Sequence, residues 1–127
     1  MSRIKYKEAI DVYPAIHELI SILELDYIDV NRIKVLYSFG SKSSAYARIH
    51  GISRVLQIAL DTKPIYVIEL ISENFNSLRK EDKIKVLIHE LLHIPKTFSG
   101  ALRPHGRYVN QKIINKFYHK YVKTKKH

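Results

Sequence analysis

The stretch IKVLIHELLH, residues 84–93, contains the pattern H-E-x-x-H within an apolar run at helical spacing. Residues four apart on an α-helix lie one above the other, so His89 and His93 can turn toward one metal ion. Glu90 flanks this pair, where its carboxylate can take a proton from a metal-bound water. The stretch therefore predicts a zinc site with His89 and His93 as ligands and Glu90 as general base.

This geometry requires a helix, and the flanking residues supply its boundaries. Ser77 is a candidate N-cap, and Glu81 and Asp82 suit the first turns. Pro95 should end the helix, because the residue before a proline avoids the α region. The competing interpretation is two incidental histidines on an ordinary amphipathic helix, and the helical context favours the zinc site over it.

A catalytic zinc ion usually has three protein ligands and a water in the fourth position. No Asp or Glu follows residue 93, so the downstream candidates are His105, His119 and His127. His105 is preferred because it follows a glycine-containing loop that can fold back over the helix. His119 reads as a surface residue, and His127 is the last residue of a basic tail. Glu69 and Glu73 are weaker upstream candidates.

The composition, 46% hydrophobic and 27% charged over 127 residues, is that of one globular domain spanning residues 1–127. No apolar run approaches the ~20 residues of a membrane span, so we expect no membrane partner. The absence of cysteine excludes disulfides, thiolate catalysis and Cys-ligated zinc. Together with a charged N-terminus that has no secretion-signal core, this predicts a cytoplasmic protein.

The other elements are predicted from the spacing of apolar residues, which has a period of 3.6 in helices and of two in strands. A helix is expected near residues 12–25, and strands are expected at 32–39 and 65–71. Residues 45–60 are ambiguous: 45–50 could be strand or helix, and Ser53 could cap a short helix ending at Leu60.

The C-terminal segment holds nearly all of the net charge of +10. Residues 94–127 contain nine Lys or Arg and no acid, and a helix is expected near 107–122. Its apolar stripe comprises Val109, Ile113, Phe117 and Tyr121. Lys112, Lys116 and Lys120 align on a neighbouring face, which favours a solvated surface but also suits nucleic acid.

The pentad at 89–93, followed after eleven residues by His105-Gly106-Arg107-Tyr108, resembles the SprT-like zinc metallopeptidases. The strings HIPKTFSG (93–100) and LRPH (102–105) are also similar to a group of metallopeptidases from archaea and their viruses. The resemblance is specific over about residues 64–108. It implies an α+β, minimal zincin-like fold: a small, antiparallel-edged sheet packed on the active-site helix, with N- and C-terminal flanking helices.

The resemblance further implies His89, His93 and His105 as zinc ligands, Glu90 as the base, and a protein or peptide substrate. SprT-like proteins often carry a Cys zinc ribbon or another DNA-binding appendage, which this chain lacks. The developing oxyanion needs a donor besides zinc. Tyr108 and Arg103 are preferred, with Arg48 and His50 as alternatives.

Two other functions remain open from the sequence. One is a zinc-dependent nuclease, which Glu90 and the long gap to His105 disfavour. The other is a nucleic-acid-binding module with a structural zinc, supported by the basic C-terminal segment. A peptidase acting on proteins bound to nucleic acid would combine these features. The sequence makes no prediction of oligomeric state.

Overall fold

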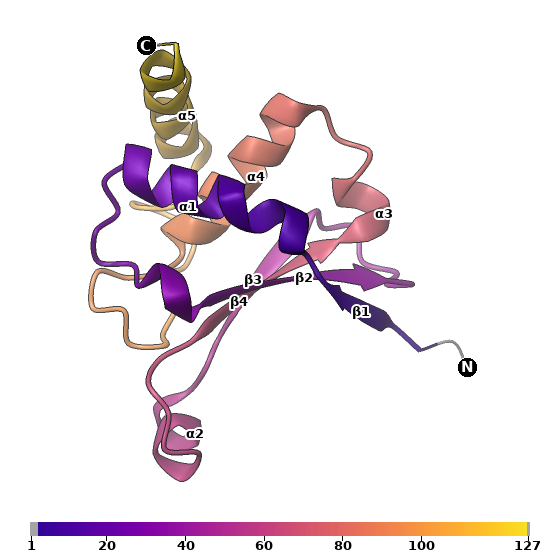
Figure 1. The fold of residues 1–127 in the computed structure, drawn as a ribbon, viewed down its shortest axis with the longest axis vertical. Helices are drawn as coiled ribbons and strands as arrows, with labels where there is room; N and C mark the ends of the chain where they lie inside the picture. Colours follow the sequence, from indigo (N-terminus) through magenta and orange to yellow (C-terminus); the bar gives the residue numbers. More distant parts are fainter. Residues whose placement is uncertain (1–2, 127) are drawn as a thin grey trace.

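A four-stranded mixed sheet lies at the centre of the computed structural model, which describes residues 3–126 (Figure 1). The strands are β1 (Lys5–Glu8), β2 (Ile33–Phe39), β3 (Ala47–Gly51) and β4 (Tyr66–Ile71), in the order β1-β2-β4-β3. Strands β2 and β4 run parallel, whereas β1 and β3 at the two edges are antiparallel to their neighbours. The predicted α+β fold with an antiparallel-edged sheet is confirmed.

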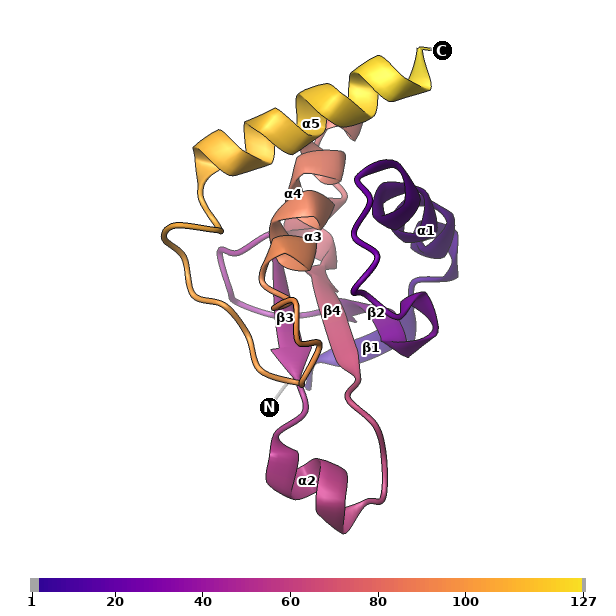
Figure 2. The ribbon, with the colours of Figure 1, turned by 90° about the vertical axis from the view of Figure 1, so that its left-hand side faces the viewer.

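Two helices, α1 (Tyr13–Ile22) and α4 (Lys80–Leu92), cover one face of the sheet, and α5 (Gln111–Lys125) crosses over both (Figures 1 and 2). The shorter elements are α2 (Arg54–Ala59), α3 (Ser72–Phe75) and 3-10 turns η1 (Ile10–Val12) and η2 (Val30–Arg32). Among the helices within residues 3–126, none is long and apolar enough to cross a membrane.

The core is built from the side chains that period-2 and period-3.6 patterns place on facing surfaces. Strand β4 is buried at every position except Val67. Its neighbours in the core come from β2, α1 and α4, and they include Ile33, Val35, Ile16, Leu19, Leu87, Ile88 and Leu91. The ambiguous residues 45–60 form β3 and α2, and Ser53 caps α2 by accepting a hydrogen bond from the Leu56 amide (3.3 Å).

The prediction of Ser77 as the N-cap of the active-site helix is wrong. The helix begins at Lys80 after Arg79, and no side chain caps it. The Ser77 hydroxyl instead donates to the Asn74 carbonyl (2.7 Å), so it belongs to the turn that follows α3. The acidic first turn and the end of the helix just before Pro95 agree with the prediction.

The C-terminal helix also begins later than expected, at Gln111. Residues 106–110 form a turn closed by the Gly106 amide donating to the Val109 carbonyl (2.9 Å), and Asn110 caps the helix through the Ile113 amide. Val109 is therefore buried ahead of the helix, and the buried positions of the helix itself are Ile114 and Tyr121. Helix α1 is also shorter than predicted, because the chain turns at Glu24 (φ +56°).

Candidate metal centre

The last turn of α4 brings the pentad histidines together as the helical spacing predicts. The ring centroids of His89 and His93 are 5.0 Å apart, and both rings lie against His105 from the loop beyond α4. The Nε2 atoms of His89 and His105 are 2.8 Å apart, and one ring nitrogen from each histidine lies within 4.8 Å of the other two. Three imidazole nitrogens this close can bind one divalent metal ion.

Tyr66 and two glycines hold the loop that carries His105. The Tyr66 hydroxyl accepts a hydrogen bond from the Gly100 amide (2.8 Å) and donates to the Ala101 carbonyl (2.7 Å). Gly100 has φ +96°, which favours glycine, and a Cβ at Gly51 would collide with the Gly100 carbonyl. The loop can therefore reach the end of β3 only because both positions lack side chains.

Arg103 connects this loop to the end of α4 through hydrogen bonds of both the Arg103 backbone and the Arg103 side chain. Its amide donates to the His93 carbonyl (2.6 Å), and its own carbonyl lies 2.6 Å from His93 Nδ1. The guanidinium donates to the Leu92 carbonyl (3.2 Å) and to the Tyr27 hydroxyl (3.4 Å). A carbonyl at Nδ1 orients a metal-binding imidazole and leaves its Nε2 free for the ion.

Burial controls the protonation of the pentad side chains. Glu90 is 5% exposed, and burial raises the pKa of its carboxyl group to about 7. Burial also lowers the pKa of His89 to about 4, with the charges of His93 and His105 acting in the same direction. Burial lowers the pKa of His93 as well. Neutral imidazoles are the form that binds metal, and a carboxylate titrating near neutrality suits proton transfer.

The three histidines and Glu90 lie in an open cleft of about 390 Å³. One wall is the edge strand β3, through Ala47, Arg48 and Ile49, and the other is the segment from Leu102 to His105. A strand beside the metal ligands was not predicted from the sequence. The alternation of small or apolar residues with polar ones in A-R-I-H-G is the signal that could have suggested it.

The backbone of β3 that faces this cleft is unpaired. The Ile71 amide donates to the Tyr46 carbonyl (3.0 Å), and hydrogen-bonded and non-hydrogen-bonded pairs alternate along antiparallel strands. With the register Ala47↔Leu70 and Ile49↔Ile68, the N–H and C=O groups of Ala47 and Ile49 therefore point away from β4. Within residues 3–126, none of these groups forms another hydrogen bond.

The other candidates for a third ligand lie elsewhere. The Glu69 carboxylate is bound by His50 (2.9 Å) and lies 3.9 Å from the Arg48 guanidinium, and Glu73 accepts the Gly40 amide (2.8 Å). His119 is exposed on α5. His127 lies outside the described residues.

The candidate oxyanion donors are distributed over different surfaces. Tyr108 does not line the cleft; it lies under the Arg103 guanidinium (5.0 Å) beside a separate groove. Arg103 borders both the cleft and this groove. Arg48 lines the cleft, and His50, the next outward side chain on β3, is paired with Glu69. The structure therefore does not bring Tyr108 to the histidines.

The model of a protein family described as "Putative phage metallopeptidase" matches residues 4–125 of the chain. This chain belongs to that family. No curated protein and no solved structure matches it. The family assignment supports a metallopeptidase and a metal cofactor, as the sequence predicted, but it supports neither the SprT-like resemblance nor an archaeal source.

In this phage-type metallopeptidase, the chemistry and orientation of the clustered side chains, as well as their number, suit a metal ion. All three donors are imidazoles, and the carbonyl at His93 Nδ1 supplies the outer hydrogen bond that orients a ligand ring. Glu90 remains outside the group as a buried carboxyl beside it. A metallopeptidase requires this combination of an ion site and an unligated acid–base group.

Proposed function

We propose that this protein is a zinc-dependent metallopeptidase that hydrolyses peptide bonds in extended polypeptide segments. The observation that carries this proposal is the clustering of His89, His93 and His105 next to the buried Glu90, in a cleft bordered by a free strand edge. Three neutral nitrogen ligands with an open position are typical of catalytic zinc sites. When bound, zinc supplies Lewis acidity and brings the pKa of water to about 7.

Glu90 is the proton-transfer group in this proposal. Its carboxylate accepts the proton of the attacking water, and the resulting carboxylic acid then delivers that proton to the leaving amine. Burial favours a pKa close to neutrality for this carboxyl group, so it can serve in both steps, and a nearby cation would shift the balance toward the carboxylate. Arg103 positions His93 through its carbonyl, and its role as an oxyanion donor, like that of Tyr108, stays a prediction.

The edge of β3 supplies the substrate-binding surface. An extended peptide can add to a sheet edge through main-chain hydrogen bonds, and here the free groups belong to Ala47 and Ile49. Such a peptide would lie between β3 and the Leu102–His105 wall, with its carbonyls over the histidines. Recognition through the backbone selects for unfolded or exposed segments over compact domains.

Metal removal tests this proposal directly. We expect the zinc-loaded protein to cleave an unfolded protein such as casein, with products identified by mass spectrometry. Treatment with a chelator should abolish cleavage, and stoichiometric zinc should restore it, because the ligands without the ion provide no Lewis acid. Cleavage that persists after complete metal removal would contradict the zinc mechanism, and zinc-loaded protein inert toward all unfolded substrates would contradict the peptidase assignment.

A second role, contact with nucleic acid, is favoured by the charge of α5. Lys120 lies 3.5 Å from Glu24, whereas Lys112 and Lys116 are exposed and, within residues 3–126, have no carboxylate partner. We expect a Lys112→Gln/Lys116→Gln variant to bind labelled DNA more weakly. The plot of log affinity against log salt should also become less steep, with the magnitude of its negative slope reduced by about two. A Lys5→Gln/Lys7→Gln variant on β1 is the matched control. Equal affinities of wild type and the α5 variant would contradict a nucleic-acid role.

A further inference from the structure

Residues 52–65, which connect β3 to β4 and contain α2, project from the sheet away from α1, α4 and α5 (Figures 1 and 2). We call this segment the finger. Its base is held in place: the Gln57 side-chain amide donates to the carbonyls of Ile52 and Ser99 (both 2.8 Å), and Arg32 donates to the Lys63 (2.7 Å) and Pro64 (3.1 Å) carbonyls. The orientation of the finger is therefore set by contacts with the protein body.

An ordinary surface helix buries its apolar face and exposes its polar face, whereas the finger does the reverse. Its polar residue Gln57 faces the protein body through the Ser99 carbonyl. The aliphatic side chains face solvent, with exposed fractions of 74% for Val55, 50% for Leu56, 69% for Ile58 and 65% for Leu60. A group of exposed aliphatic side chains on a projecting element is typical of a surface that contacts a protein partner or a membrane.

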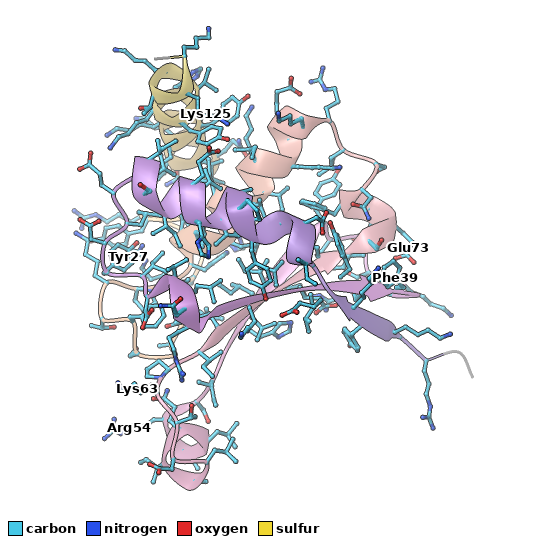
Figure 3. All side chains as sticks on the ribbon, viewed as in Figure 1. Tyr27, Phe39, Arg54, Lys63, Glu73 and Lys125 are labelled. Carbon is cyan, nitrogen blue, oxygen red and sulfur yellow. The ribbon has the colours of Figure 1, made fainter. Side chains whose placement is uncertain are left out.

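Shape and charge distinguish between the possible partners. The exposed aliphatic tip consists of four side chains, Val55, Leu56, Ile58 and Leu60, whereas a stable protein–protein interface uses about 20–30 residues on each side. Two fingers packed against each other would therefore form too small an interface for a stable dimer. Arg54 and Lys63 are exposed on one side of the finger, and Asp61 is the one acid in residues 52–65 (Figure 3). Exposed aliphatic side chains beside cations complement an anionic lipid surface.

We propose that the finger inserts its aliphatic tip into the surface of an anionic lipid bilayer, with Arg54 and Lys63 on the lipid headgroups. The sequence predicted no membrane partner because it contains no spanning segment, but a peripheral contact of this kind needs none. The finger contacts the active-site loop at Ser99 and Gly100. Bilayer contact would therefore hold the metal cleft close to the lipid surface and direct it toward substrates there.

Vesicle binding by the full-length, metal-loaded protein tests this proposal. We expect the protein to sediment with vesicles of equimolar phosphatidylcholine and phosphatidylglycerol, and much less with phosphatidylcholine alone. A Val55→Ser/Ile58→Ser/Leu60→Ser variant should bind about tenfold or more weakly, because it removes the inserted aliphatic groups. An Arg54→Gln/Lys63→Gln variant should also bind roughly tenfold more weakly, with a smaller salt dependence.

The control variant is Ile4→Ser/Ile10→Ser, which removes exposed aliphatic groups outside the finger and should bind as wild type does. Unchanged thermal unfolding and metal content would show that each variant is folded. Three results would overturn the proposal: wild type that does not bind anionic vesicles, a triple-serine variant that binds as tightly as wild type, or light scattering that shows a lipid-free dimer which the triple-serine variant converts to monomer. If the triple-serine variant bound as tightly as wild type, lipid binding would be assigned to the lysines of α5 alone.

Discussion

A Glu90→Gln variant is expected to lose about 10²–10⁴-fold in kcat while keeping its metal. The amide of Gln fills the same buried position but cannot accept and return a proton. Burial raises the pKa of the Glu90 carboxyl to about 7. The group of side chains that could hold the ion comprises His89, His93 and His105 and does not include Glu90. The substitution therefore removes proton transfer and leaves the ion site intact. Steady-state kinetics on an unfolded substrate and metal analysis of the same preparation measure both consequences.

The matched control is Glu81→Gln, which neutralises an exposed acid in the first turn of the same helix. We expect its kcat and metal content to equal those of wild type. A Glu90→Gln protein that cleaves at the wild-type rate would contradict the role of Glu90 as the base. Loss of metal in that variant would instead show that Glu90 contributes to the ion site.

A His105→Ala variant is expected to bind metal about 100-fold more weakly or worse and to lose hydrolysis with it. Outer hydrogen-bond partners of metal ligands already account for about 10–100-fold in affinity, and a direct ligand contributes more. The remaining pair, His89 and His93, would hold the ion with two nitrogens from one helix. Metal content after purification and a competition titration with a zinc chelator give the two affinities.

His119→Ala provides the comparison, because His119 was the alternative third ligand and is exposed on α5 away from the histidine group. It should retain both metal and activity. If His105→Ala retained stoichiometric metal, the third ligand would lie elsewhere and the His105 assignment would be wrong. If His119→Ala alone lost metal, the assignment of the two histidines would be reversed.

The errors in the sequence prediction fall where local signals compete. Ser77 is a good capping residue, but its hydroxyl is used by the Asn74 carbonyl, so α4 begins at Lys80 without a side-chain cap. Asn110 caps α5, so the helix begins at Gln111, four residues later than the expected start at 107, and Val109 lies in a turn. Several residues near a helix end can each form such bonds, and tertiary contacts select among them.

The sequence by itself determined the part of the site that depends on short-range geometry. The spacing of His89 and His93 places two imidazoles on one helical face, and their neighbour Glu90 follows from the same helix. The apolar periodicities of α4, β2 and β4 determined the helix-on-sheet core for the same reason: each depends on residues only two to four positions apart. The family match to residues 4–125 supports the prediction of a metallopeptidase.

The tertiary structure decided what depends on residues far apart in the chain. Tyr66 and Gly51 fix the loop that carries His105, and the sheet order brings the free edge of β3 to the histidines. The outward-facing aliphatic side chains of α2 follow from Gln57 binding to Ser99, 42 residues away. Periodicity shows that a side chain is apolar but not which surface it faces, because that depends on long-range packing that no local pattern encodes.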